Sequence, residues 1–93
     1  MDTQQSIALL NKAMGNELQT VHQHMYWHFH VDDQGFGPLA VLLKHTAIVE
    51  MGHIGKLAER IPFLKGDVQM VASAPMQPII EPADILARTG RPV

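Results

Sequence analysis

The stretch IALLNKAMGNELQTVHQHM, residues 7–25, decides the fold because its apolar residues recur at steps of three and four. This spacing places them on one side of an α-helix. Since no proline occurs between Thr3 and Asp33, we expect one amphipathic helix of about thirty residues, roughly 45 Å long. The apolar residues that define its buried side are Ile7, Leu10, Met14, Leu18, Val21 and Met25.

The segment GFGP, residues 35–38, supplies a helix stop, a tight turn and a proline suited to the first turn of a helix. We therefore expect a second amphipathic helix from about Pro38 to Leu64, antiparallel to the first. Pro62 should kink or fray its last turn. The side that we predict to face the first helix carries Leu39, Leu42, Thr46, Val49, His53, Leu57, Arg60, Ile61 and Leu64.

After Gly66 the sequence changes in character, because residues 67–82 contain three prolines and cannot form a regular helix. We expect an extended connector here, followed by a short helix from Pro82 to Thr89. The predicted architecture is all-α. Residues 1–66 form a helical hairpin, and residues 67–93 form a proline-rich connector with a short C-terminal helix.

The composition limits both the size of the core and the kinds of partner. With 93 residues, 46% of them hydrophobic, the chain makes one small domain, so we expect it to associate with copies of itself. A net charge of -2 argues against nucleic acid as a partner. No cysteine is present to bind a metal, and no apolar run is long enough for a membrane. We expect a soluble, cytoplasmic protein without a membrane partner.

Three residues with metal-binding side chains are predicted to converge in the hairpin. Glu17 lies nineteen residues before the turn at Phe36, and His53 lies seventeen residues after it, so both lie at nearly the same height. Glu50 and His53 are one helical turn apart on one face. Burying carboxylates without a proton or cation is costly. A solvated Glu-x-x-His pair is the simpler interpretation, but it does not account for Glu17.

One hairpin does not close a ligand set around two cations. Two hairpins related by a twofold axis would bring together four glutamates and two histidines, which is the known ligand inventory of ferritin-like di-iron bundles. Carboxylate oxygens with one imidazole for each metal suit iron or manganese, and zinc is a further candidate. We therefore expect a homodimer in which two hairpins form a four-helix bundle around the metals.

Two long segments resemble a known family. LLNKAMGNELQTVHQHMYWHF, residues 9–29, resembles the first helix of bacterioferritins, and LKHTAIVEMGHIGKLAERIPFLKG, residues 43–66, resembles their second helix. Because the second helix pair of the family is missing, the chain is similar to a half-length bacterioferritin. The resemblance implies ferroxidase activity at a di-iron centre. Glu50 would bridge the irons, Glu17 would be a terminal carboxylate, and His53 would be a terminal imidazole.

The other histidines are harder to assign. His24 occupies a position where the family usually has a tyrosine, so it either hydrogen-bonds the metal site or adds a ligand. The resemblance implies that His45 serves a nearby iron on the inner surface, although a solvated histidine explains it equally well. His22, His28 and His30 have no assigned role. His24 and His28 are spaced to bind a surface metal, but solvated or inter-subunit histidines are the commoner case.

Met51 projects away from the predicted metal-binding face. The resemblance implies that it is an axial ligand of haem b or a related iron porphyrin. The small residues Ala47, Gly52 and Gly55 around it would leave room for a flat ring, and glycines inside a helix are unfavourable unless that space is needed. The alternative is a methionine filling a bare helix-to-helix interface.

These observations give one leading hypothesis and two rivals. The first is a half-length bacterioferritin that oxidises Fe(II) in a homodimer, binds haem through Met51 and assembles into a hollow homo-oligomer of about twelve chains for iron detoxification or storage. The second is a haem-binding electron-transfer or sensor module whose di-metal site is structural. The third is a truncated ferritin fragment that dimerises without any chemistry.

Overall fold

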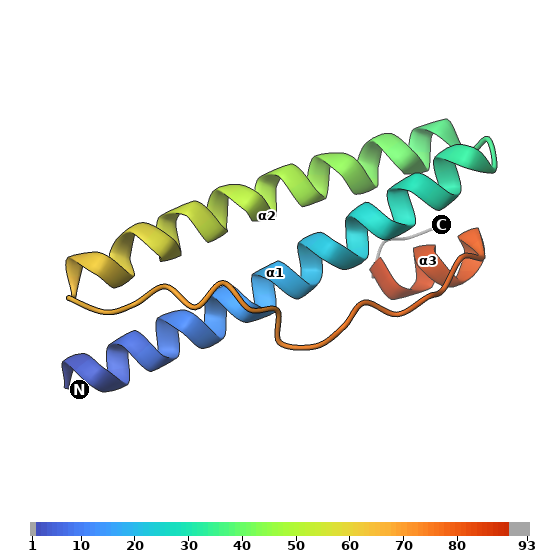
Figure 1. Cartoon of the computed structure of the whole chain (residues 1–93). Coiled ribbons are helices and arrows are strands. Elements are labelled where there is room, and N and C mark those ends of the chain that lie inside the picture. Colours follow the sequence, from blue (N-terminus) through green and yellow to red (C-terminus); the bar gives the residue numbers. More distant parts are fainter. Residues whose placement is uncertain (1, 90–93) are drawn as a thin grey trace.

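The computed structural model describes residues 2–89 and shows a helical hairpin with a third, short helix. Helix α1 spans Thr3–Asp33, α2 spans Gly37–Phe63 and α3 spans Pro82–Thr89. Figure 1 shows α1 and α2 lying side by side in opposite directions, with α3 beside the turn end of α1. The predicted all-α hairpin and its short C-terminal helix are confirmed, and α2 begins and ends one residue earlier than we expected.

The helix ends follow from local sequence. The Asp2 side chain accepts a hydrogen bond from Gln5 N while the Gln5 side chain accepts one from Asp2 N, which forms a capping box at the start of α1. Gly35, with φ of 87°, ends α1 in a left-handed cap in which Phe36 N donates to Val31 O at 2.9 Å. The cap turns the chain sharply into α2.

Helix α2 ends in the same kind of cap one residue after Pro62. Lys65 adopts a φ of 68°, Gly66 N donates to Ile61 O at 3.0 Å, and Lys65 N donates to Pro62 O at 2.8 Å. Pro62 therefore lies in the last turn of α2. Proline has no backbone N–H, so one hydrogen bond of the helix is missing there, close to its end. The cap starts the connector back towards α1.

The buried stripe of α2 differs from the one we predicted by about one residue. The fully buried residues include Ala40, Leu43 and Ala47, whereas Val49 is exposed. The contact line therefore contains the small residues Ala40 and Ala47 as well as larger aliphatic residues. The observed line on α2 follows steps of three and four through Ala40, Leu43, Ala47, Glu50, Ile54, Leu57 and Ile61.

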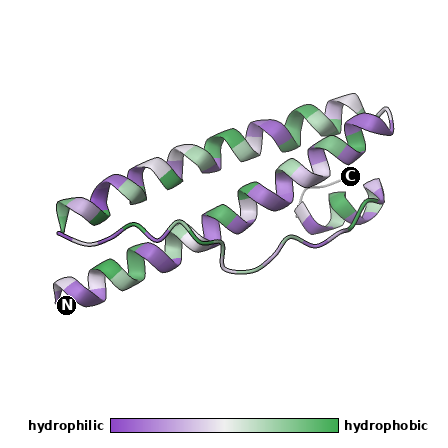
Figure 2. Ribbon diagram, in the orientation of Figure 1, coloured by the Kyte–Doolittle hydropathy of each residue, from purple (hydrophilic) through white to green (hydrophobic). Residues whose placement is uncertain are grey.

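The core consists of two clusters at different heights in the hairpin. Near the turn, the buried residues are Trp27, Val31, Ala40, Leu43 and Ile85. In the other half they are Ile7, Met14, Ile54 and Ile61, surrounded by partly exposed leucines and valines. Figure 2 shows hydrophobic and hydrophilic residues alternating along both long helices. The radius of gyration of 15.3 Å exceeds the roughly 12 Å of a compact domain of this length, as expected for one layer of helices.

The connector between α2 and α3 runs back along α1, as Figure 1 shows. An extended segment leaves backbone N–H and C=O groups that need partners. Side-chain amides of α1 supply them, because both Asn11 and Gln23 donate to one connector group and accept from another. The amide groups of Asn11, Gln23 and Gln34 bind the carbonyls of Asp67, Gln77 and Ile80 in that order.

None of the helices in the described part of the chain combines the length and the apolar character that crossing a lipid bilayer requires.

Candidate metal centre

Three side chains suited to binding a metal converge at one level of the hairpin. Glu17 comes from α1, and Glu50 and His53 come from α2. His53 Nδ1 lies 3.3 Å from Glu50 Oε2 and 3.6 Å from Glu17 Oε2. One ligand atom of each residue lies within 4.8 Å of the others, so all three can reach one cation, and across residues 2–89 no other set of three His, Asp or Glu residues does so.

Helix periodicity places these residues together. Glu17 follows Met14 by three residues and precedes Val21 by four, so it lies on the line by which α1 contacts α2. Glu50 occupies the corresponding line of α2, three residues after Ala47. His53 lies one turn beyond Glu50 at the edge of this contact line. The convergence that we predicted from the distances to the turn is therefore present in the fold.

The electrostatics of this cluster suit a cation. The side chains of Glu17 and Glu50 are 30% and 21% exposed, and that of His53 is 51% exposed. Glu17 Oε2 is buried and has no hydrogen-bond partner within the described residues. A buried carboxylate oxygen without a donor is unfavourable unless a proton or a cation compensates it. Two carboxylates and one imidazole form a donor set that suits iron, manganese or zinc.

His24 and His45 do not join this cluster. His24 Nδ1 lies 2.9 Å from Thr20 O of the same helix, and its ring packs edge-on against Trp27 with centroids 5.4 Å apart. His45 is exposed on α2. The structure does not bring either imidazole among the three converging ligand atoms.

His28 has a structural contact that the sequence did not reveal. Its Nδ1 lies 2.7 Å from Ala40 O, which links α1 to the first turns of α2. His30 packs against Tyr26 with ring centroids 4.5 Å apart, and His22 is exposed. The contact of His28 depends on the register between the two helices, so spacing along α1 alone gave no signal for it.

A separate apolar pocket of 410 Å³ lies on the face that carries Met51. Gly55 lines this pocket, and a Cβ added there would have no neighbour within 4 Å, as we predicted for a residue that leaves space. No charged or hydrogen-bonding side chain lines it. The lining residues are Leu18, Val21, Met51, Ile54, Gly55, Ala58 and Met70.

Three features of this pocket differ from the sequence-based expectation. Ala47 does not line it, because this alanine is fully buried in the contact between α1 and α2, and Gly52 does not line it either. Met70 does line it, although this residue belongs to the connector and was not a candidate. The proline-rich segment has no periodicity from which a facing residue could be predicted, so only the path of the connector reveals the contribution of Met70.

Sequence comparisons relate the chain to known proteins. A family model described as a ferritin-like domain matches residues 7–89. The chain is 46% identical over 61 residues to a bacterioferritin of Desulfovibrio desulfuricans, an alignment that covers 66% of this chain and 34% of that protein. It is 36% identical over 73 residues to a bacterioferritin of Rhodobacter capsulatus, covering 76% of this chain and 44% of that protein.

The matched regions leave more than half of each relative uncovered, so the chain spans less than half the length of the curated relatives it matches. No solved structure gives a significant match. The family model, at residues 7–89, spans the segment that contains Glu17, Glu50 and His53.

Proposed function

The chain belongs to the ferritin-like domain family, and from this premise we propose that it is a half-length, bacterioferritin-like ferroxidase. In this proposal the substrate is Fe(II), the oxidant is O2 or H2O2, and the reaction serves iron detoxification or storage. The observation that carries the proposal is the convergence of Glu17, Glu50 and His53, with a buried oxygen of Glu17 that lacks a hydrogen-bond partner.

The proposal requires two copies of the chain. One hairpin offers two carboxylates and one imidazole, which is half of the ligand inventory of a di-iron bundle. A second copy related by a twofold axis would double the set and would also cover the partly exposed side chains around Glu17. We propose a homodimer as the working unit, with assembly into a larger homo-oligomer, of which a cage of about twelve chains is one form.

Each ligand residue has a proposed part in the reaction. Glu50 lies on the contact line and would bridge two Fe(II) ions, while Glu17 and His53 would each bind one ion from the side. Holding two Fe(II) ions together lets each give one electron to the same O2 molecule, which takes up two protons and leaves as H2O2. The carboxylates offset the additional positive charge of the Fe(III) products.

Two features of the Met51 pocket support the proposal of a bound iron porphyrin: apolar residues line it, and a thioether is available as a ligand. We propose haem b or a related porphyrin as the occupant, with Met51 as an axial ligand. A porphyrin bound there would supply one-electron transfer. We also propose that residues 1–66 are a ferritin-like helical hairpin that carries Glu17, Glu50, Met51 and His53, and that residues 67–93 are a proline-rich connector with a short C-terminal helix.

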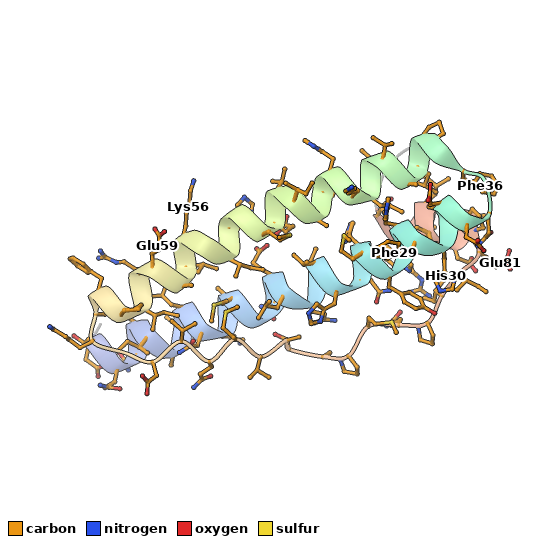
Figure 3. All side chains as sticks on the ribbon, turned by 45° about the horizontal axis from the view of Figure 1, so that its top comes forward. Phe29, His30, Phe36, Lys56, Glu59 and Glu81 are labelled. Atoms are coloured by element: carbon orange, nitrogen blue, oxygen red, sulfur yellow. The ribbon has the colours of Figure 1, made fainter. Side chains whose placement is uncertain are left out.

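An iron titration in air tests the ferroxidase proposal. The metal-free protein should oxidise about two Fe(II) per dimer in a fast phase, followed by the absorbance of the Fe(III) product. Glu50→Ala should slow this phase at least a hundredfold, on the order of 3 kcal/mol in the barrier. Glu59→Ala is the matched control, because Figure 3 shows Glu59 and Lys56 on α2 pointing away from α1. Oxidation by Glu50→Ala at the parent rate would refute the site.

A haem-binding electron-transfer or sensor module is the second candidate function, and the Met51 pocket favours it. In that case the three-residue cluster holds a structural metal such as zinc. Metal analysis and the visible spectrum of the purified protein distinguish the two functions. Zinc in the cluster, a Met51-dependent porphyrin spectrum and no fast iron oxidation would together favour the module over the ferroxidase.

A further inference from the structure

Met70 is the one residue of the connector that reaches the apolar pocket of Met51. In the single chain both methionines are 55% exposed, although they border a cavity of 410 Å³ without polar lining. A volume of this size lies within the range of small-molecule sites, roughly 300 to 1,000 Å³. Two flexible thioether side chains that line an apolar pocket are suited to contact with a large apolar ligand.

The connector is attached to α1 on both sides of Met70. Before it, Gln69 N donates to Asn11 Oδ1 at 3.0 Å, and Asn11 Nδ2 donates to Asp67 O at 3.0 Å. Asn11 itself is buried. These two bonds fix the backbone immediately before Met70, so the position of this residue does not depend on its own side chain.

A second attachment follows three residues after Met70. Ser73 N donates to Gly15 O at 3.0 Å. A Cβ at Gly15 would lie 2.8 Å from Val71 O, so the glycine is what lets the connector lie this close to α1. Met70 is therefore held between two fixed points rather than on a free loop.

The backbone of Met70 is also strained. Its φ is 49°, in the left-handed region that residues other than glycine and asparagine rarely adopt. No glycine occupies this position, although glycine would relieve the strain. Strained residues that persist in a well-attached segment commonly have a functional side chain.

We propose that Met70 forms the connector wall of the porphyrin site, where it contacts the bound macrocycle and excludes water from the sulfur of Met51. This inference rests on the proposed porphyrin site at Met51. It assigns to the connector a role in ligand binding as well as in covering α1. Because Met51 would supply the sulfur ligand of the porphyrin iron, Met70 would act by apolar contact and not by ligation.

Haemin titration of the metal-free, full-length protein tests the proposal, with affinity and visible spectrum as separate readouts. Met70→Ala should weaken haemin binding about tenfold, the effect expected for losing part of one buried apolar side chain. The spectrum of the bound form should stay that of the parent. Met70→Leu keeps the apolar volume and should bind within about twofold of the parent. Met76→Ala, in another exposed connector methionine that does not line the pocket, is the matched control.

The outcomes separate this proposal from the one on which it rests. If Met51→Leu leaves both affinity and spectrum unchanged, the porphyrin site itself is wrong. If Met51→Leu changes the spectrum while Met70→Ala binds as tightly as the parent, the porphyrin site stands and the connector wall is refuted. A spectral change in Met70→Leu like that of Met51→Leu would also refute it, because Met70 would then be an axial ligand. Thermal unfolding of each metal-free variant shows whether a loss of affinity reflects a loss of fold.

Discussion

At the turn end of the hairpin, Ile85 of α3 completes a cluster with Trp27 and Leu43, and all three side chains are at most 5% exposed. The other half has no third helix, and the connector covers only part of it, with Val68 packed against the cluster of Met14 and Ile54. There Leu18 and Val21 stay partly exposed, and both line the Met51 pocket. The chain thus finishes its own core at one end and leaves the other end incomplete.

The two halves differ in the chemical groups that they contain. The turn end contains mostly apolar groups, and a short helix of the same chain is enough to cover them. The open half contains two carboxylates, an imidazole and an apolar pocket; His53 stays exposed, and from the connector only Met70 lines the pocket. The carboxylates favour a cation, and the apolar pocket favours an apolar ligand. We therefore expect ligands to bind in the open half.

Removing the cover from the turn end should have the largest effect on stability. Ile85→Ala leaves a cavity beside Trp27 and Leu43, and we expect it to lower the free energy of unfolding by about 3 kcal/mol. Chemical denaturation followed by circular dichroism measures this change. Ile80→Ala is the control, since this connector isoleucine is 40% exposed, and it should change stability by under about 0.5 kcal/mol. Equal effects of the two substitutions would mean that α3 does not complete the core.

Replacing a carboxylate of the open half by an apolar side chain should raise the free energy of unfolding, and by less than Ile85→Ala lowers it. Glu17→Leu replaces the carboxylate whose buried oxygen lacks a donor, so the metal-free protein should gain on the order of 1 kcal/mol. Denaturation in the presence of a chelator measures the gain, and iron binding at the cluster should be lost. Glu59→Leu, on the outer face of α2, should give no comparable gain. A less stable Glu17→Leu protein would show that the carboxylate is already well compensated without metal.

The smallest expected changes in stability come from replacing glycines of α2, and these substitutions test whether haemin binds in the Met51 pocket or on the helix surface beside it. Gly52 and Gly55 both lie inside α2 with open space at the position of a Cβ, so alanine at either position should stabilise the metal-free protein by about 0.5 to 1 kcal/mol. Only Gly55 lines the pocket. Gly55→Ala should therefore weaken haemin binding several-fold while Gly52→Ala does not, as measured by titration. Equal haemin affinities in the two variants would remove the Met51 pocket as the binding site.

Much of the site could be predicted from the sequence because it depends on helix periodicity. Glu17 and His53 are nearly equidistant from the turn at Phe36, and Glu50 is one turn from His53, so two helices and one turn suffice to bring them together. The placement of the stripe on α2 was less accurate. Val49 was predicted to face α1, but it is exposed, and the contact line runs one residue later along α2, through Ala47 and Ile54. Adjacent apolar residues such as Leu42 and Leu43 fit either line, so periodicity alone did not choose between them.

Residue spacing was enough to predict the two long helices, the turn between them and the level at which the acidic and imidazole groups meet, because these depend on contacts between near neighbours and on one length measured from the turn. The path of the connector, the bonds by which Asn11 holds it and the place of Met70 in the Met51 pocket became visible only in the folded chain. An extended segment has no period of its own, so its neighbours are set by hydrogen bonds to residues more than fifty positions away.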